Sequence, residues 1–310
     1  GRLGGGVVTS RGHAGNCGNS RSGRKLPPLD SLPRGNSFLA VNSPSERCIR
    51  LTLHYDGSGF AGWQIQRGAR TVQGELEKAL SKLTNRPVRV TAAGRTDAGV
   101  HATGQVVGAR VPAKWTPAAL RRALNAILPR DIWVASAEEA PLDFHARYDA
   151  VARSYVYRIG TTEFTRSPFH RPWCWPLAEP LDLAVLGAAA AAVEGEHSFR
   201  AFAKAGQPER GERCIVYSAR WAPWGELGVA FHITANRFLH HMVRYLVGTM
   251  VAVARGRRPL EDMARLLANE PGLETSPPAP PEGLFLTRVY YSPDELAEAQ
   301  RAGVVASDLP

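Results

Sequence analysis

The 310-residue sequence has few cysteines and few lysines, and it has no apolar run of transmembrane length. Its four cysteines are scattered and form no C-x-x-C pair, so we expect neither a disulfide framework nor a zinc site of the usual spacing. The nine histidines include no H-E-x-x-H spacing, and we therefore predict no metal. These absences favour a protein of a reducing compartment, with no membrane contact, and a cytoplasmic location is the expectation.

Basic residues are abundant, but almost all of them are arginine. The formal net charge is +10 and the pI is about 9.8, and only five of the 38 basic residues are lysine. Arginine binds phosphate in a bidentate manner and stacks on bases, so the bias suits an RNA partner. A GC-rich genome produces the same bias, and at this point both explanations stay open.

The first 46 residues differ in composition from the rest of the chain. They hold nine glycines, with six basic residues against two acidic ones and few large apolar side chains. We expect residues 1–46 to be a disordered basic extension, with an organellar transit peptide as the alternative. We expect the remaining chain to divide into an N-terminal lobe at 47–150, which carries the Asp97 loop, a C-terminal lobe at 151–292 and a tail at 293–310.

Apolar periodicity predicts a similar order of strands and helices in both lobes. Thr71 and Thr116 are suited to cap the first two helices, and Pro117 fits the first position of the second. The sequence predicts an α+β fold of two similar lobes, with a mostly antiparallel sheet flanked by helices and a cleft between the lobes. We expect strands at 49–55, 86–92, 105–111, 132–137, 151–160, 213–221, 227–235 and 284–291, and helices at 72–83, 117–127, 183–193, 238–254 and 260–267.

A glycine-rich loop follows the first expected strand and contains the pattern G-x-G-x-x-G at Gly57, Gly59 and Gly62. That pattern is typical of NAD-dependent enzymes only where the glycines open a helix directly. Here Trp63 and a further glycine, Gly68, come before the expected helix. We therefore expect no nucleotide cofactor.

The stretch from Ala92 to Val107 combines glycines with one arginine, one carboxylate and one histidine. Asp97 follows the end of an expected strand, and Arg95 lies two residues before it. An aspartate beside glycine is most often a turn residue that bonds its own backbone. The local pattern alone leaves that interpretation open beside a chemical one.

The string Gly-Arg-Thr-Asp-Ala-Gly-Val-His-Ala, which starts at Gly94, resembles the catalytic signature of the tRNA pseudouridine synthase A family. The resemblance covers nearly all of residues 47–292. Other motifs of that family recur in register, namely Tyr55-Asp56-Gly57, Gly62-Trp63-Gln64, Asp143-Phe144-His145-Ala146-Arg147, Arg153-Ser154-Tyr155, Phe238-Leu239-His240-His241-Met242-Val243-Arg244 and Glu282-Gly283-Leu284.

The resemblance implies an isomerase that converts uridine to pseudouridine at positions 38, 39 and 40 of tRNA, acts as a homodimer and needs no cofactor. By resemblance, Asp97 is the nucleophile, which attacks C6 of the base or C1′ of the sugar, and Arg244 pairs with it. Tyr155 stacks on the target uracil or accepts its C5 proton, and Arg95 helps to turn the nucleotide out of its stack.

Two alternatives remain beside this interpretation, and one histidine is left out of it. The chain could be an RNA-binding module of the same fold without catalysis, although the full set of catalytic residues argues against it. Arg244 could be a solvated helix residue, but its apolar neighbours favour a buried and paired role. His101 belongs to the same string, in an expected loop where a histidine is most often solvated, and we leave it out of the catalytic set.

Overall fold

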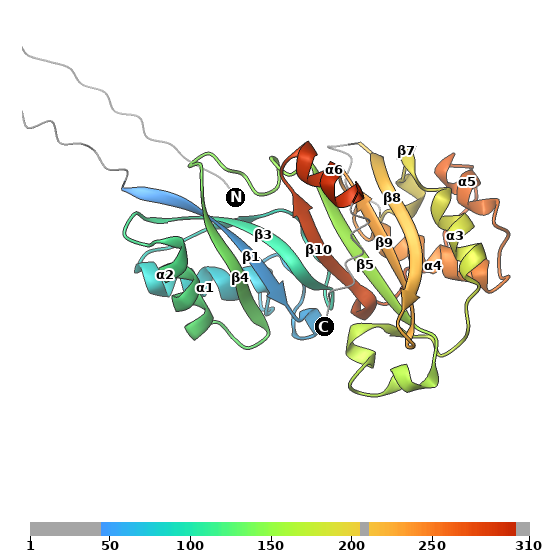
Figure 1. Ribbon diagram of the computed structural model, residues 1–310, viewed down its shortest axis with the longest axis horizontal. Helices are drawn as coiled ribbons and strands as arrows, with labels where there is room; N and C mark the ends of the chain where they lie inside the picture. Colours follow the sequence, from blue (N-terminus) through green and yellow to red (C-terminus); the bar gives the residue numbers. More distant parts are fainter. Residues whose placement is uncertain (1–44, 205–210, 302–310) are drawn as a thin grey trace, which may run out of the picture. The chain divides into compact units, whose positions relative to one another are not determined.

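In the computed structural model, residues 45–204 and 211–301 are described, and within them one ten-stranded sheet runs through both halves of the chain (Figure 1). Its strand order is β4-β1-β3-β10-β5-β9-β8-β7, with β2 beside β3 and β6 beside β5. The pairings are antiparallel except for β3 with β10 and β5 with β6. The predicted α+β class is confirmed. Residues 1–44 of the expected extension lie outside the described residues, and Glu46 already begins the first strand.

The N-terminal half follows the sequence prediction closely. Thr71 Oγ1 accepts the backbone N–H of Gly74, and Thr116 Oγ1 accepts that of Ala119, so both predicted caps are present. The strand predicted at 86–92 is shorter, because only its last three residues pair with β3. The elements are β1 (Glu46–Tyr55), α1 (Val72–Thr84), β2 (Val90–Ala92), β3 (His101–Pro112), α2 (Pro117–Ile127) and β4 (Ile132–Ala140), with a short 3-10 turn at Gly57–Gly59.

The C-terminal half contains elements that periodicity did not predict, chiefly short strands and a last helix. Residues 293–301 of the expected tail form α6, whose Leu296 is buried against β10, and residues 302–310 lie outside the described part. The elements are β5 (Ala152–Gly160), β6 (Trp175–Pro176), α3 (Leu183–Ala191), β7 (Gly195–Ser198), β8 (Arg213–Trp224), β9 (Gly228–Ala235), α4 (Met242–Ala254), α5 (Asp262–Leu267), β10 (Leu284–Tyr290) and α6 (Pro293–Arg301).

Helix α4 begins four residues later than the sequence predicts. His241 has φ = 64°, a left-handed conformation that an α-helix does not continue through, so the helix starts at Met242. From there α4 buries most of its apolar residues, as its apolar circumference indicates, and it packs against α3. The late start leaves residues 238–241 as an irregular segment that faces the other half of the chain.

Strand β10 lies in the middle of the sheet, although it comes near the end of the sequence (Figure 1). It pairs in parallel with β3, where Phe285 lies opposite His101, and antiparallel with β5. The approach to β3 is so close that a Cβ atom at Gly104 would lie 2.0 Å from the carbonyl oxygen of Thr287. Glycine is therefore required at this position, and β10 joins the two halves into one sheet.

Apolar side chains between the sheet and the helices form the core. Leu76 and Leu80 of α1 and Leu120 and Leu124 of α2 are fully buried in the N-terminal half. In the C-terminal half the core contains buried side chains of α3, α4 and α5 together with those of β5, β8 and β9. Among the described residues, none of the helices has the length and apolar character needed to span a membrane.

Candidate active site

A cleft of about 980 Å³ lies where the two halves of the sheet meet. Its lining includes the loop between β2 and β3, the loop between β4 and β5, two residues of strand β5, and residues 236–241 before α4. The side chains that the sequence singles out at this cleft are Arg95, Asp97 and Tyr155. The cleft between the lobes that the sequence predicts is therefore present, and it carries the signature loop on one wall.

The signature loop, residues 93–100, takes its shape from close backbone packing against the glycine-rich loop. A Cβ atom at Gly57 would lie 2.1 Å from the carbonyl oxygen of Val100, and Gly62, with φ = 91°, lies against the backbone of Thr96. Trp63 N–H also donates to the carbonyl oxygen of Thr96 at 3.0 Å. The glycines of the G-x-G-x-x-G pattern thus support the signature loop instead of opening a helix for a nucleotide.

A buried amide holds the same loop from its other side. Gln105 is fully buried, and its Nε2 donates to the carbonyl oxygen of Gly94 at 2.8 Å while its Oε1 accepts Gly94 N–H at 3.4 Å. Its Nε2 also lies 3.4 Å from the hydroxyl oxygen of Tyr55, which is 2.8 Å from Thr96 Oγ1. Sequence reasoning missed Gln105, although one amide inside an apolar strand was a usable signal.

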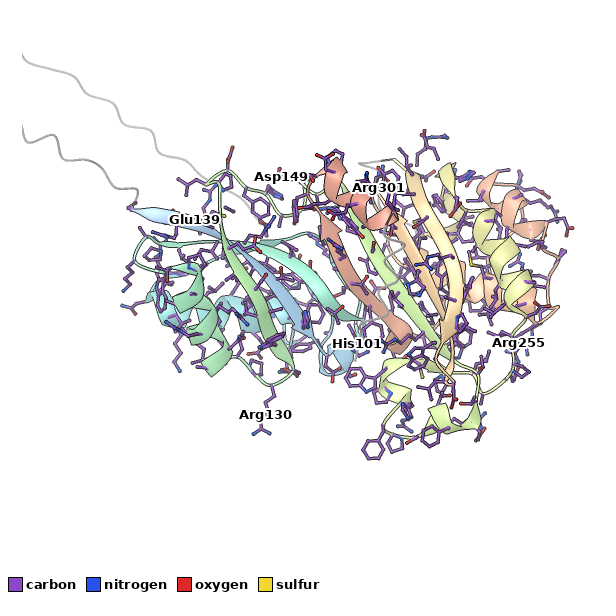
Figure 2. All side chains as sticks on the ribbon, in the orientation of Figure 1. His101, Arg130, Glu139, Asp149, Arg255 and Arg301 are labelled. Atoms are coloured by element: carbon purple, nitrogen blue, oxygen red, sulfur yellow. The ribbon has the colours of Figure 1, made fainter. Side chains whose placement is uncertain are left out.

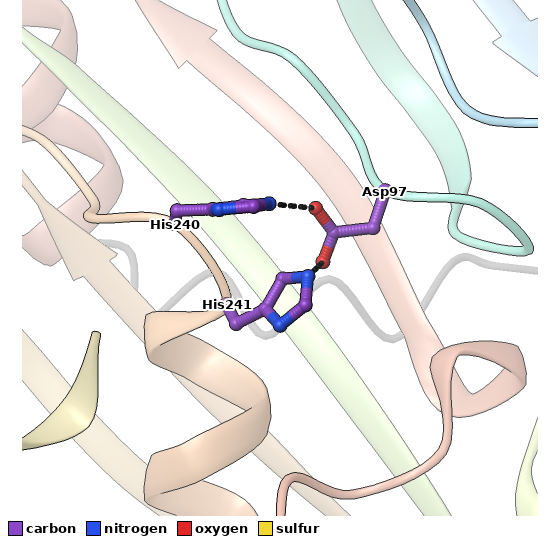
Figure 3. A group of neighbouring side chains, drawn as sticks. All are labelled: Asp97, His240 and His241. Carbon is purple, nitrogen blue, oxygen red and sulfur yellow. Dashed lines mark ion pairs between the residues drawn. The ribbon is translucent and has the colours of Figure 1, made fainter. Parts of the chain in front are cut away.

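The carboxylate of Asp97 faces three basic side chains across the cleft. Arg244 Nη1 lies 3.3 Å from Oδ2. His241 Nε2 lies 3.3 Å from the same oxygen, and His240 Nε2 lies 3.5 Å from Oδ1 (Figure 3). Arg244 Nε donates to the carbonyl oxygen of Ala279 at 2.7 Å, which fixes the guanidinium. The side chains of Asp97 and Arg244 are 19% and 13% exposed, so the expected pair is largely shielded from water.

The two histidines were quoted as part of a motif, but their contact with Asp97 was not predicted. The left-handed backbone of His241 turns its ring toward the carboxylate, and the two imidazole centroids lie 4.1 Å apart. Burial lowers the pKa of His241, although the negative charge of Asp97 acts in the opposite direction. A mainly neutral imidazole at pH 7 can still bond the carboxylate through a protonated Nε2.

Asp97, His240 and His241 could also hold a metal ion, because one ligand atom from each lies within 4.8 Å of the others. Two imidazoles and a carboxylate are a set that zinc accepts. Arg244, at 3.3 Å from Oδ2, would leave a positive charge beside any bound dication, which opposes tight binding. The sequence-based expectation of no metal stays a prediction.

Tyr155 and Arg95 occupy different depths of the cleft. Tyr155 is 8% exposed and packs edge-on against Phe238, with ring centroids 4.9 Å apart. Burial raises the pKa of Tyr155, and the nearby Tyr55 adds to this rise. Arg95 is exposed and lines the opening. Tyr157, two residues along β5, is fully buried and donates to Pro280, as expected of a core tyrosine.

His101 is not the solvated loop residue that the sequence predicts. The residue, labelled in Figure 2, belongs to β3 and is 1% exposed. Its ring packs against those of Phe285 and Trp173, whose centroids lie 4.7 Å and 5.0 Å away. Its Nδ1 accepts the N–H of Gly57 at 3.1 Å, and its Nε2 lies 3.0 Å from the carbonyl oxygen of Pro172. The prediction was wrong because β3 begins four residues earlier than its apolar alternation indicates.

One buried arginine ties together the segments that surround the cleft. Arg153 is 8% exposed and donates to four carbonyl oxygens: Ala93 at 3.0 Å, Arg147 at 2.6 Å, Ala150 at 2.9 Å and Asn236 at 3.0 Å. These carbonyls belong to the signature loop, the loop between β4 and β5, and the segment before α4. The sequence places Arg153 in the motif Arg153-Ser154-Tyr155, but it does not predict this role.

Comparisons with known proteins agree with this arrangement. A family model described as tRNA pseudouridine synthase matches residues 52–149 and 189–292. A tRNA pseudouridine synthase A of Moorella thermoacetica is 43% identical over 250 residues, which cover 79% of this chain and 99% of the relative. One of Geobacillus sp. is 39% identical, with coverage of 78% and 98%, and one of Solidesulfovibrio magneticus is 43% identical, with coverage of 78% and 90%.

Proposed function

Because this chain belongs to the tRNA pseudouridine synthase family, we propose that it isomerises uridine to pseudouridine in the anticodon stem-loop of tRNA, at positions 38, 39 and 40. One observation carries the proposal: Asp97, on the signature loop of one half, lies 3.3 Å from Arg244 of the other half, inside a cleft large enough for a nucleotide. A carboxylate held in this way is suited to nucleophilic attack.

The proposed reaction rearranges bonds within the substrate. The glycosidic bond between N1 and C1′ breaks, and a new bond forms between C5 and C1′. The proton leaves C5 and N1 gains a proton, so no electrons are exchanged and no redox partner is consumed. Asp97 forms the transient covalent bond, at C6 of the base or at C1′ of the sugar, and is released unchanged.

Arg244 and the two histidines act on Asp97 and not on the uracil in this proposal. The guanidinium compensates the charge of the carboxylate when the bound nucleotide excludes water from the cleft. His240 and His241 hold the two carboxylate oxygens from one side, which restricts the side-chain torsions of Asp97. A nucleophile fixed in this way loses little entropy on reaching its target.

Tyr155 and Arg95 bind the target nucleotide in this proposal. Since burial raises the pKa of Tyr155, its phenol is protonated at neutral pH, which favours stacking on the uracil over removal of the C5 proton. Arg95 lies at the opening, where a side chain can occupy the space that a rotated nucleotide leaves. The net charge of +10 supports binding of a polyanion.

The test is tritium release from tRNA whose uridines carry tritium at C5. We expect release into water without added cofactor, from a tRNA with uridine at positions 38 to 40. A matched tRNA with cytidine at these three positions should release no tritium. Binding without release from either tRNA would support the alternative, a catalytically inactive RNA-binding module. Release from the cytidine-substituted tRNA would contradict the proposed target positions.

The homodimer and the cytoplasmic location are also proposals, and they rest on the resemblance and on the tRNA substrate. Light scattering on the purified chain should give about twice the 33.6 kDa mass of one copy. A monomer at micromolar concentration would contradict the homodimer without affecting the proposed reaction.

A further inference from the structure

The loop between β4 and β5 carries a pair of stacked aromatic rings at the edge of the cleft. The rings of His145 and Tyr148 lie nearly parallel, with centroids 4.1 Å apart and an interplanar angle of 29°. Both residues line the cleft, and Tyr148 is 60% exposed. A large aromatic side chain left so exposed beside an RNA-binding cleft offers a flat surface for a nucleobase.

Hydrogen bonds within the loop fix this ring pair. His145 Nδ1 accepts the backbone N–H groups of Arg147 and Tyr148, each at 3.2 Å, and so the ring carries its proton on Nε2. The carboxylate of Asp149, labelled in Figure 2, accepts the N–H of His145 at 2.8 Å. Because the His145 ring already has a fixed orientation, a base that stacks on the Tyr148 ring has to immobilise few additional groups, which lowers the entropic cost of binding.

The ring pair is also held at a fixed place relative to the signature loop. Arg153 donates to the carbonyl oxygens of Arg147 and Ala150 on one side and to that of Ala93 on the other. The guanidinium of Arg147 lies 6.0 Å from the centroid of the Tyr148 ring, so a cation accompanies the aromatic surface. An aromatic ring with an arginine beside it is the usual surface on which single-stranded nucleic acids stack.

We propose that Tyr148, supported by His145, is a stacking subsite for an unpaired base that neighbours the target uridine in the substrate RNA. The inference rests on the proposed function, because rotation of the target nucleotide into the cleft removes the stacking partner of its neighbours. The exposed Tyr148 ring replaces that partner. The subsite recognises the π-face of a base and therefore accepts any of the four bases.

Kinetics on three variants test the subsite. Tyr148→Ala should raise KM for tRNA about tenfold with kcat within twofold, a change typical of one lost base stack. Tyr148→Phe keeps the ring and should stay within twofold of wild type in both constants. Phe169→Ala is the control, because Phe169 is 82% exposed but does not line the cleft, and it should change neither constant. An unchanged KM in Tyr148→Ala, with an unchanged melting temperature, would overturn the proposal, as would a Phe variant as impaired as the Ala variant.

A binding experiment separates this inference from the proposed function. The probe is an anticodon stem-loop RNA with 2-aminopurine in place of the nucleotide on the 5′ or the 3′ side of the target uridine. Stacking quenches 2-aminopurine, so one of the two probes should lose fluorescence on binding to wild type and regain it with Tyr148→Ala. Quenching without any tritium release would contradict the proposed function and leave the subsite standing. Equal fluorescence with wild type and Tyr148→Ala for both probes would overturn the subsite.

Discussion

The two walls of the cleft hold their functional residues by different physical means. On the signature-loop wall, the side chain of Gln105 bonds the backbone of Gly94 with both polar atoms, and Tyr55 and Thr96 continue the network. On the α4 wall, apolar burial does the same task, since Leu246 and Val247 are fully buried below Arg244. Hydrogen bonds of buried polar side chains dominate on the first wall. Burial of apolar side chains dominates on the second, where the bond of Arg244 to the carbonyl oxygen of Ala279 adds to it.

This difference predicts different failures. A hydrogen bond acts over a narrow range of geometry, and loss of one partner leaves the other buried and unsatisfied, so damage to the polar wall stays local. Packing contributes much more to the free energy of unfolding, and its loss is shared by the whole core. Damage to the loop wall should therefore lower turnover, whereas damage to the α4 wall should lower stability.

Asp97→Asn should have the largest effect on activity. The amide keeps the size of the side chain, but it cannot act as the nucleophile, so we expect tritium release below detection. Binding of tRNA should stay within a few-fold of wild type, because phosphate contacts elsewhere provide most of the affinity. Tritium release at a tenth of the wild-type rate or more would refute Asp97 as the nucleophile.

Arg244→Leu should lower kcat about a hundredfold, because it removes the guanidinium beside the carboxylate and leaves a shorter apolar side chain. Arg244→Lys restores the charge but cannot bond Asp97 and Ala279 together, so it should recover only part of the activity. Turnover of both variants is compared with their melting temperatures. Wild-type turnover in Arg244→Leu would show that the pairing of Arg244 with Asp97 is not needed for activity.

Gln105→Leu should lower kcat about tenfold and leave KM for tRNA within threefold, because the signature loop loses its bond to Gly94. The free energy of unfolding should fall by about 1–3 kcal/mol, since the partly buried backbone N–H and carbonyl groups of Gly94 lose their partner. Gln105→Glu keeps an acceptor for the N–H of Gly94, and its kcat should lie between those of wild type and Gln105→Leu. If core variants with the same loss of stability lose as much kcat as Gln105→Leu, then Gln105 acts only as part of the core.

Leu246→Ala should show the opposite balance on the α4 wall. Loss of a fully buried leucine is expected to lower the free energy of unfolding by about 2–5 kcal/mol. Turnover measured well below the melting temperature should stay within about twofold of wild type, because the contacts of Arg244 are made on another face of the helix. A tenfold loss of kcat at low temperature would show that both walls are equally sensitive.

The smallest effect should come from His232, on β9 and remote from both walls. Burial lowers the pKa of His232 to about 4, and Arg220 and Arg158 add to this effect. Between pH 6.5 and 4 the unfolded chain therefore binds a proton that the folded chain does not, and stability falls as the pH falls. His232→Gln should flatten the decline in melting temperature over this window, though not abolish it, because the pKa values of His54 and His241 are lowered too.

Much of the fold and part of the site could be predicted from local sequence. The caps at Thr71 and Thr116 act within three residues, and Asp97 belongs to a contiguous signature, so both signals are readable in a short window. Gln105 and Arg153 could not be assigned in this way. Their partners are backbone carbonyls, such as that of Asn236, which any residue type supplies and which only the folded chain brings near.

The dependence on distant parts of the chain also explains why two features near the site, the burial of His101 and the start of α4, differ from the sequence prediction. His101 is buried because Phe285 and Trp173, from distant parts of the chain, enclose its ring. The start of α4 at Met242 depends on the left-handed backbone of His241, although apolar periodicity continues smoothly through that residue. In both places, tertiary contacts decide a feature that propensity alone would assign differently.

The central place of β10 bears on how the enzyme forms during translation. Strand β3 ends at Pro112, but its partner β10 begins only at Leu284, so the ribosome adds the intervening segment first. At about 5–20 residues per second this takes roughly 10 to 30 s. Throughout that time the start of β3, at His101 and Ala102, is without its neighbour on this edge and is open to pairing with other nascent chains. The two halves of the catalytic cleft can be joined only after β10 has left the ribosome. The cleft is therefore assembled late in the synthesis of each chain.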